Sequence, residues 1–129
     1  MKPKPDENVS AWFSSIDDRD LFLSTVVLGE VRKGILLLPE SRRRTAFEEW
    51  FRESVELAFA GRVLSYDSHA AKLWAERCAI AEKNGHPRAV ADSMIAATAL
   101  RYDMILVTRN VKDMDYMGVN ILNPFEISA

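Results

Sequence analysis

The sequence predicts an α/β fold in which a parallel sheet is flanked by helices. Short apolar runs rich in β-branched residues alternate along the chain with longer segments whose apolar residues recur at helical spacing. Strands that alternate with helices usually build a parallel sheet whose faces the helices cover. The 129 residues suffice for a single core, and no repeat, linker or low-complexity tract divides them. We therefore expect one domain over residues 1–129.

The first part of the chain is expected to form a short helix, a strand and a longer helix. VSAWFSS, residues 9–15, has the pattern of a short helix, and the charged residues 17–20 end it. The run LFLSTVV, 21–27, is apolar and β-branched, which is typical of a buried strand. In LGEVRKGILLLP, 28–39, apolar residues recur at helical spacing until Pro39 ends the helix.

The remaining elements follow the same alternation. An amphipathic helix is predicted over 42–60, with Gly61 as its stop, and RVLSY, 62–66, is the next strand candidate. Asp67 and Ser68 are expected to cap a helix that runs to about Asn84. The last elements are a helix rich in small residues and two strands, over RAVADSMIAATALRY, 88–102, MILVT, 104–108, and VNIL, 119–122.

Composition excludes several broad classes of function. A formal charge of −2 provides no general field for a nucleic acid, so any such contact needs a local basic patch. Arg42–Arg44 could supply one, and a solvated helix start explains these arginines equally well. The single cysteine, Cys78, rules out an internal disulfide and fits a reducing compartment. No apolar run approaches membrane-spanning length, so we expect a soluble cytoplasmic protein.

Three acidic residues are placed where a parallel sheet presents its ligands, beyond the carboxyl ends of its strands. Glu30 lies three residues past LFLSTVV, and Asp113 follows MILVTRN. Asp92 has the apolar helical neighbours Ile95, Ala96 and Ala99, so its carboxylate faces a desolvation cost of several kcal/mol unless something pairs with it. Thr108 and Asn110 offer further polar groups at the same edge of the predicted sheet.

Each acid also has an ordinary structural explanation. Glu30 can complement the positive end of the helix that follows the strand. Asp92 can be an N-cap, if its helix starts late, or a partner of Arg88. Asp113 lies in a polar loop where solvated acids are common. Of these residues, Asp92 is the one that local sequence favours most clearly as a site residue.

Three carboxylates at one edge of a sheet repel each other unless a cation joins them. Oxygen ligands suit Mg²⁺ or Mn²⁺, and such an ion can activate water against a phosphodiester. Other chemistry has little support, because His69, His86 and Cys78 lack metal-ligand spacing. We expect the two histidines to be structural or exposed. The sequence also lacks a nucleophile elbow and a phosphate-binding loop.

The segments LSTVVLGEVRKGI, VADSMIAATAL, LVTRNVKDM and VNILNP, in this order, resemble a PIN domain, and more narrowly the VapC/FitB-type toxins of bacterial toxin–antitoxin pairs. The resemblance covers essentially the whole chain. It implies a three-layer fold and a Mg²⁺- or Mn²⁺-dependent endoribonuclease. It implies Glu30, Asp92 and Asp113 as catalytic and metal-site residues, with Thr108 and Asn110 as supporting polar residues. It also implies an RNA substrate, an antitoxin partner and a homodimer.

The family carries one more metal-site aspartate, in an Asp-x-Asn-Val signature that ends its first, central strand. Here Asp6 begins such a signature, but Pro3 and Pro5 precede it and lack the N–H that a central strand needs. We therefore interpret Asp6 as unrelated to the site and expect the family's first strand to be missing from this sequence. An unusual site that uses Asp6 is the alternative.

The expected loss leaves two functional hypotheses. The first is the metal-dependent ribonuclease toxin, and the second is an inactive remnant that only binds and sequesters an antitoxin. A receiver-like regulatory domain is disfavoured, because the acid pair that such a domain needs at an N-terminal strand end is absent from the sequence.

Overall fold

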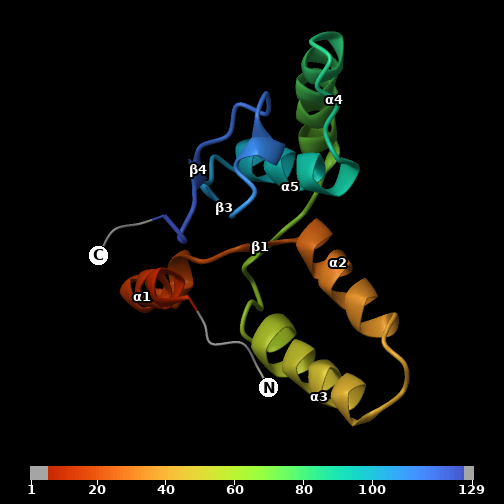
Figure 1. Cartoon of the computed structure of the whole chain (residues 1–129), viewed down its shortest axis with the longest axis vertical. Coiled ribbons are helices and arrows are strands. Elements are labelled where there is room, and N and C mark those ends of the chain that lie inside the picture. The colour runs from red at the N-terminus through yellow and green to blue at the C-terminus, as the bar shows by residue number, and fades with distance from the viewer. Residues whose placement is uncertain (1–5, 127–129) are drawn as a thin grey trace.

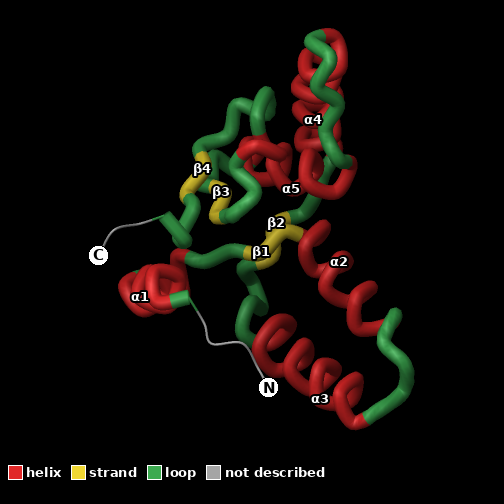
Figure 2. The backbone as a smooth tube through the Cα atoms, in the orientation of Figure 1, coloured by secondary structure: helices red, strands yellow, loops and turns green. Residues whose placement is uncertain are grey.

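The computed structural model describes residues 6–126, which form two small parallel sheets (Figures 1 and 2). Strand β1 (Leu23–Ser24) pairs with β2 (Val63–Leu64), and β3 (Leu106–Val107) pairs with β4 (Ile121–Leu122). Both pairings are parallel, as the alternation of strands and helices predicts. Within residues 6–126, no ladder joins the two pairs into one sheet.

The N-terminal half begins with helix α1 (Glu7–Ser15). The carboxylate of Asp6 caps this helix, because it accepts the backbone N–H groups of Asn8 and Val9 at 2.8 and 3.1 Å. Asp6 is therefore the N-cap of α1. The interpretation of Pro3 and Pro5 concerns residues 1–5, which lie outside the described residues.

Helix α2 (Thr25–Leu36) starts earlier than the sequence predicts. The Ser24 hydroxyl accepts the Val27 N–H at 3.0 Å and so caps the helix at Thr25. The prediction of a strand through Val27 is therefore wrong at its C-terminal end. A short 3₁₀ turn, η1 (Asp18–Asp20), separates α1 from β1.

Helix α3 (Arg42–Trp50) continues into a π-helical segment, η2 (Phe51–Leu57), and lies beside α2 (Figure 1). The buried side chains of Ile35, Phe51 and Val55 form the core of this half. Three partly buried residues from β1 and α2 pack against them, namely Leu23, Leu28 and Val31. Among the aromatic residues of the amphipathic helix predicted over 42–60, Phe51 is core, whereas Phe47 and Trp50 are exposed.

The C-terminal half contains α4 (Ser68–Lys83), α5 (Val90–Arg101) and the 3₁₀ turn η3 (Lys112–Met114). Asp67 caps α4 as predicted, since its carboxylate accepts the Ala70 N–H at 2.9 Å. A second core lies here, made of Cys78, Ala96, Ala97, Met114 and Met117. Helix α5 packs on α4 and also contacts α2 and β1, so it links the halves. Among residues 6–126, no helix is long and apolar enough to cross a membrane.

Candidate functional site

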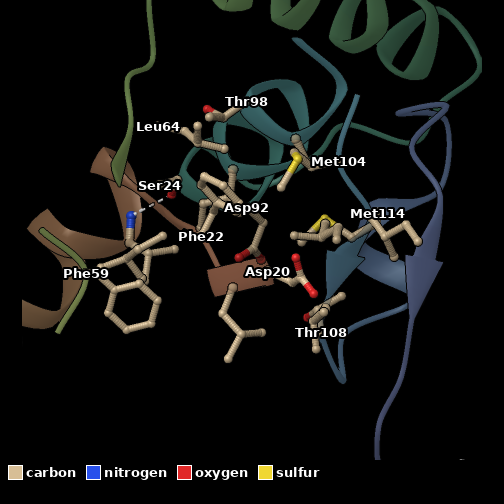
Figure 3. A pocket seen from close by; sticks show the side chains of 18 of the residues that line it. Asp20, Phe22, Ser24, Phe59, Leu64, Asp92, Thr98, Met104, Thr108 and Met114 are labelled. Carbon is tan, nitrogen blue, oxygen red and sulfur yellow. Dashed lines mark hydrogen bonds between the residues drawn. The ribbon is translucent and has the colours of Figure 1, made fainter. Parts of the chain in front are cut away.

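A cavity of about 390 Å³ lies between the two sheets, with α5 contributing to its wall (Figure 3). Residues 21–24 line it from the β1 side and residues 104–108 from the β3 side. The lining is mostly apolar, and it includes a small number of polar side chains: Asp20, Ser24, Asp92, Thr98 and Thr108. Ligand sites commonly combine apolar walls with a few polar groups in this way.

Asp92 is the predicted site residue that the structure places in this cavity. Figure 3 shows its side chain reaching from α5 into the space, and the residue is half-buried. It is not an N-cap, because the helix is preceded by Ala89 and Asp92 lies in the first turn. It is not a partner of Arg88, whose guanidinium donates to the carbonyls of His86 and Lys112, both at 2.9 Å.

Packing between α4 and α5 fixes the direction of Asp92. The neighbouring residue, Ser93, is fully buried, and its hydroxyl accepts the indole N–H of Trp74 at 2.8 Å. The same hydroxyl donates to the Val90 carbonyl at 2.8 Å. Ala96 and Ala97 are also fully buried, so α5 approaches its neighbours closely on that side. Because this side of α5 packs against its neighbours, the Asp92 side chain points toward the cavity.

The segment after β3 carries the two predicted supporting residues, and the structure separates them. Thr108 lines the cavity, and its hydroxyl accepts the backbone N–H of Asn110 at 3.0 Å. Thr108 is anchored to β4 by its own N–H, which donates to the Leu122 carbonyl at 3.0 Å. Asn110 is exposed and does not line the cavity.

Glu30 and Asp113 are exposed, and neither lines the cavity. The sequence predicted Glu30 in the first turn of a helix that begins at residue 28. Because α2 begins at Thr25, Glu30 instead falls in the second turn. Asp113 lies in η3. In the part of the chain that the structure describes, no three His, Cys, Asp or Glu side chains are grouped closely enough to hold a metal ion. The assignment of Glu30, Asp92 and Asp113 to one metal site therefore stays a prediction.

Asp92 nevertheless has the chemistry that a hard divalent ion requires. Mg²⁺ is usually bound by one or two carboxylates together with waters and substrate phosphates, and not by a full cage of protein ligands. Among the described residues, Asp92 takes part in no ion pair, so its carboxylate is free to meet a cation. Asp20 also lines the cavity, although the sequence predicted only a polar helix stop over residues 17–20. Its place directly before an apolar run is the signal that was available.

The fold and the sequence agree with one known family. The model of the PIN domain matches residues 3–117, and the chain belongs to the PIN-domain family. It is 35% identical over 125 residues to VapC ribonuclease Y4jK of Sinorhizobium fredii, covering 97% of this chain and 89% of that protein. It is 32% identical to toxin FitB of Neisseria gonorrhoeae, covering 97% and 90%.

A solved structure extends the similarity to three dimensions. The crystal structure of FitAcB from Neisseria gonorrhoeae matches with a TM-score of 0.90 and 32% identity, over 98% of this chain and 91% of that one. The predicted PIN-like α/β fold and the predicted relationship to VapC/FitB toxins are therefore confirmed.

Proposed function

We propose that this protein is a metal-dependent endoribonuclease, the toxin of a toxin–antitoxin pair, which hydrolyses RNA phosphodiester bonds. The observation that carries the proposal is Asp92, a half-buried carboxylate that lines a cavity without an ion-pair partner among residues 6–126. Membership of the PIN family supports it, as does the similarity to a VapC ribonuclease and to toxin FitB. We place the protein in the cytoplasm as a single domain.

The residues that would hold Mg²⁺ or Mn²⁺ are Asp92, Glu30 and Asp113. A bound divalent ion supplies an activated water and neutralises charge on the phosphoryl oxygens. The carboxylate of Asp92 directs negative charge toward the cavity, and the mostly apolar lining strengthens the attraction between this carboxylate and a cation. The Thr108 hydroxyl and the Asn110 amide would orient a phosphate or a ribose at the rim.

We propose an antitoxin and a second copy of this chain as its protein partners. Several large apolar side chains of α2, α3 and η2 are exposed, namely Leu36, Leu37, Phe47, Trp50 and Leu57. Such a surface favours protein contacts over solvent. Similar solved structures include the VapBC-1 and FitAcB complexes, the first of which shares 20% identity and so supports the fold alone.

A partner-binding protein without catalysis is the second candidate. It is favoured by the absence, among residues 6–126, of three grouped metal-ligand side chains. The same exposed apolar surface would serve it.

Incubation of the purified chain with single-stranded RNA separates the two candidates. The ribonuclease should cleave in Mg²⁺ or Mn²⁺, and EDTA should stop cleavage. A chain that binds a co-expressed antitoxin but leaves RNA intact in every metal tested would instead be the non-catalytic partner-binding protein.

A further inference from the structure

An aromatic and cationic cluster joins the loop before α5 to the loop after η3. The rings of His86 and Tyr116 stack with centroids 5.3 Å apart and planes inclined by 21°. The Arg88 guanidinium lies over the Tyr116 ring, 5.9 Å from its centroid. Arg88 also donates to the carbonyls of His86 and Lys112 at 2.9 Å, so one side chain ties both loops together.

Tyr116 holds an unusual backbone conformation that turns a large ring outward. Its φ is +73°, a region that bulky residues seldom occupy, and 41% of the residue is exposed. Its neighbours Met114 and Met117 are buried at 4% and 0% exposure and anchor the loop on both sides. Strained, exposed residues held by a well-packed surround occur most often at functional sites.

Several basic residues near the stack lack an acidic partner among the described residues. Arg77, Arg88 and Lys112 enter no ion pair among the described residues. The Arg77 guanidinium lies against Gly118, where a Cβ would meet its Cζ at 3.0 Å. The acids in the same segment are Asp113 and Asp115, and both are exposed. Arg88, over the Tyr116 ring, and Arg77, at Gly118, therefore lie near the stack without an ion-pair partner among the described residues.

We propose that the stack of His86 and Tyr116, with Arg88, is a docking platform for one nucleotide of single-stranded RNA. This inference rests on the proposed function. A base extends the stack of rings, and the guanidinium meets the adjoining phosphate. Base–aromatic stacking combined with cationic contacts to the backbone is the general mode by which proteins bind single strands.

The position of the platform relative to the candidate acids gives it a role. Arg88 bonds the carbonyl of Lys112, which directly precedes Asp113, and it lies two residues before α5, whose first turn carries Asp92. A nucleotide held here is adjacent in the fold to both segments that carry acids. The platform is thus a substrate-positioning surface, and its residues take no part in bond cleavage.

Binding without cleavage tests the proposal, because EDTA removes the metal that hydrolysis needs. Fluorescence anisotropy of fluorescein-labelled oligouridine and oligoadenosine RNA would report affinity for the full chain and its variants. Tyr116→Gly should weaken binding about tenfold, the loss typical of one stacked base. Glycine accepts a φ of +73° without strain, so the variant should keep its fold. Tyr116→Phe keeps the ring and should bind as the wild type does.

The salt dependence of binding tests the phosphate contact. Arg88→Ala should reduce the slope of log affinity against log salt by about 0.7, the change expected for one phosphate on a single strand. Arg32→Ala is the matched control, because Arg32 also lies over an aromatic ring, Phe51 at 5.8 Å, but on α2. Its slope and affinity should stay unchanged.

The outcomes separate this inference from the proposed function. If the wild type cleaves RNA while Tyr116→Gly and Arg88→Ala bind it like the wild type, the platform is overturned and the ribonuclease stands. If Arg32→Ala weakens binding as much as Arg88→Ala, the attraction is non-specific and the platform is again overturned. If Tyr116→Gly impairs only antitoxin binding, the surface serves a protein. A wild type that neither binds nor cleaves RNA overturns both proposals.

Discussion

At the scale of single residues, Asp92 is the most direct test of the proposed chemistry. Asp92→Asn keeps the size of the side chain and removes its negative charge. We expect metal-dependent RNA cleavage by this variant to fall to the level of an EDTA control, because an amide is a poor ligand for a hard divalent ion. The fold should be retained, since no hydrogen bond or ion pair of the described residues uses the Asp92 carboxylate. Cleavage rates and circular dichroism would measure both effects.

Asp103 offers a matched control at the other end of α5. It is exposed and has a φ of +55°, a conformation that asparagine adopts as readily as aspartate. Asp103→Asn should therefore cleave at the wild-type rate. Equal loss in both variants would mean that α5 is perturbed as a whole and that Asp92 has no special role.

Asp67 links charge to stability at the start of α4. The N–H of Ala70, followed by the Arg101 guanidinium at 3.1 Å, holds the pKa of the Asp67 carboxyl below its ordinary value of 3.8. A carboxyl whose pKa is lowered by folding stabilises the folded state above pH 3.8, and this contribution is lost as the pH falls through the folded-state pKa. Asp67→Ala should thus destabilise the protein at neutral pH, with a smaller effect in acid.

Urea unfolding at neutral pH and below pH 3.8 would check this dependence. Asp67→Asn separates the contribution of the helix cap from that of the ion pair with Arg101. Asparagine is an equally good cap, but it carries no charge that could attract Arg101. It should be milder than Asp67→Ala at neutral pH. A pH-independent difference between the wild type and Asp67→Ala would contradict the prediction.

At the scale of elements, α2 contains an apparent weakness. Gly34 lies in the interior of the helix one turn beyond Glu30, and an added Cβ would meet no atom within 4 Å. Gly34→Ala should therefore stabilise the protein by about 0.5–1 kcal/mol, the usual helical preference for alanine. If the open space at Gly34 accommodates the substrate, the rate of RNA cleavage should fall while the free energy of unfolding rises. Thermal unfolding and cleavage assays on the same variant would show both changes.

Gly85 provides the opposite case and serves as the control. It follows α4 at a φ of +77°, also with open space around it. Gly85→Ala should cost about 1–2 kcal/mol, because the strain lies in the backbone alone. If both alanine variants shift stability in the same direction, our explanation of the two glycines is wrong.

The sequence predicted the order and type of the elements better than their ends. The run LFLSTVV favours a strand throughout on composition, yet only Leu23 and Ser24 form one. A serine followed three residues later by a free N–H can cap a helix, and this local bond decided where the strand stopped. β-propensity describes fit to a pleated surface, so it cannot locate such an end by itself.

The candidate site was predictable where the local sequence carried an energetic conflict. Asp92 stands among small apolar residues, and that conflict singled it out. The cation–aromatic cluster of His86, Arg88 and Tyr116 had no comparable signal, because its members are 30 residues apart at their extremes (116 − 86) and only folding brings them together. The sequence placed Glu30 one turn too early in its helix, because the Ser24 cap that starts α2 at Thr25 was not recognised.

At the scale of the whole molecule, two separate cores should respond separately to damage. Ile35→Ala in the first core and Met117→Ala in the second each remove a buried side chain, at a cost of about 2–5 kcal/mol. Hydrogen exchange should rise mainly in α2 and α3 for the first variant and in α4 and α5 for the second. Equal rises throughout for both variants would show that the halves unfold as one unit.

The gap between the two sheets also bears on how this protein behaves in concentrated solution. Leu23 donates its N–H to the Arg62 carbonyl, and Leu106 and Thr108 donate theirs to the carbonyls of Asn120 and Leu122. The alternate peptide groups of β1 and β3 therefore face away from their partner strands. Phe22, Ile105 and Val107 alternate with them and are 42%, 60% and 37% exposed. An edge with bare peptide groups and apolar side chains is a template for a strand of another molecule. Self-association that grows with protein concentration, and that charged substitutions at Ile105 suppress, is therefore the expected colloidal consequence of this architecture.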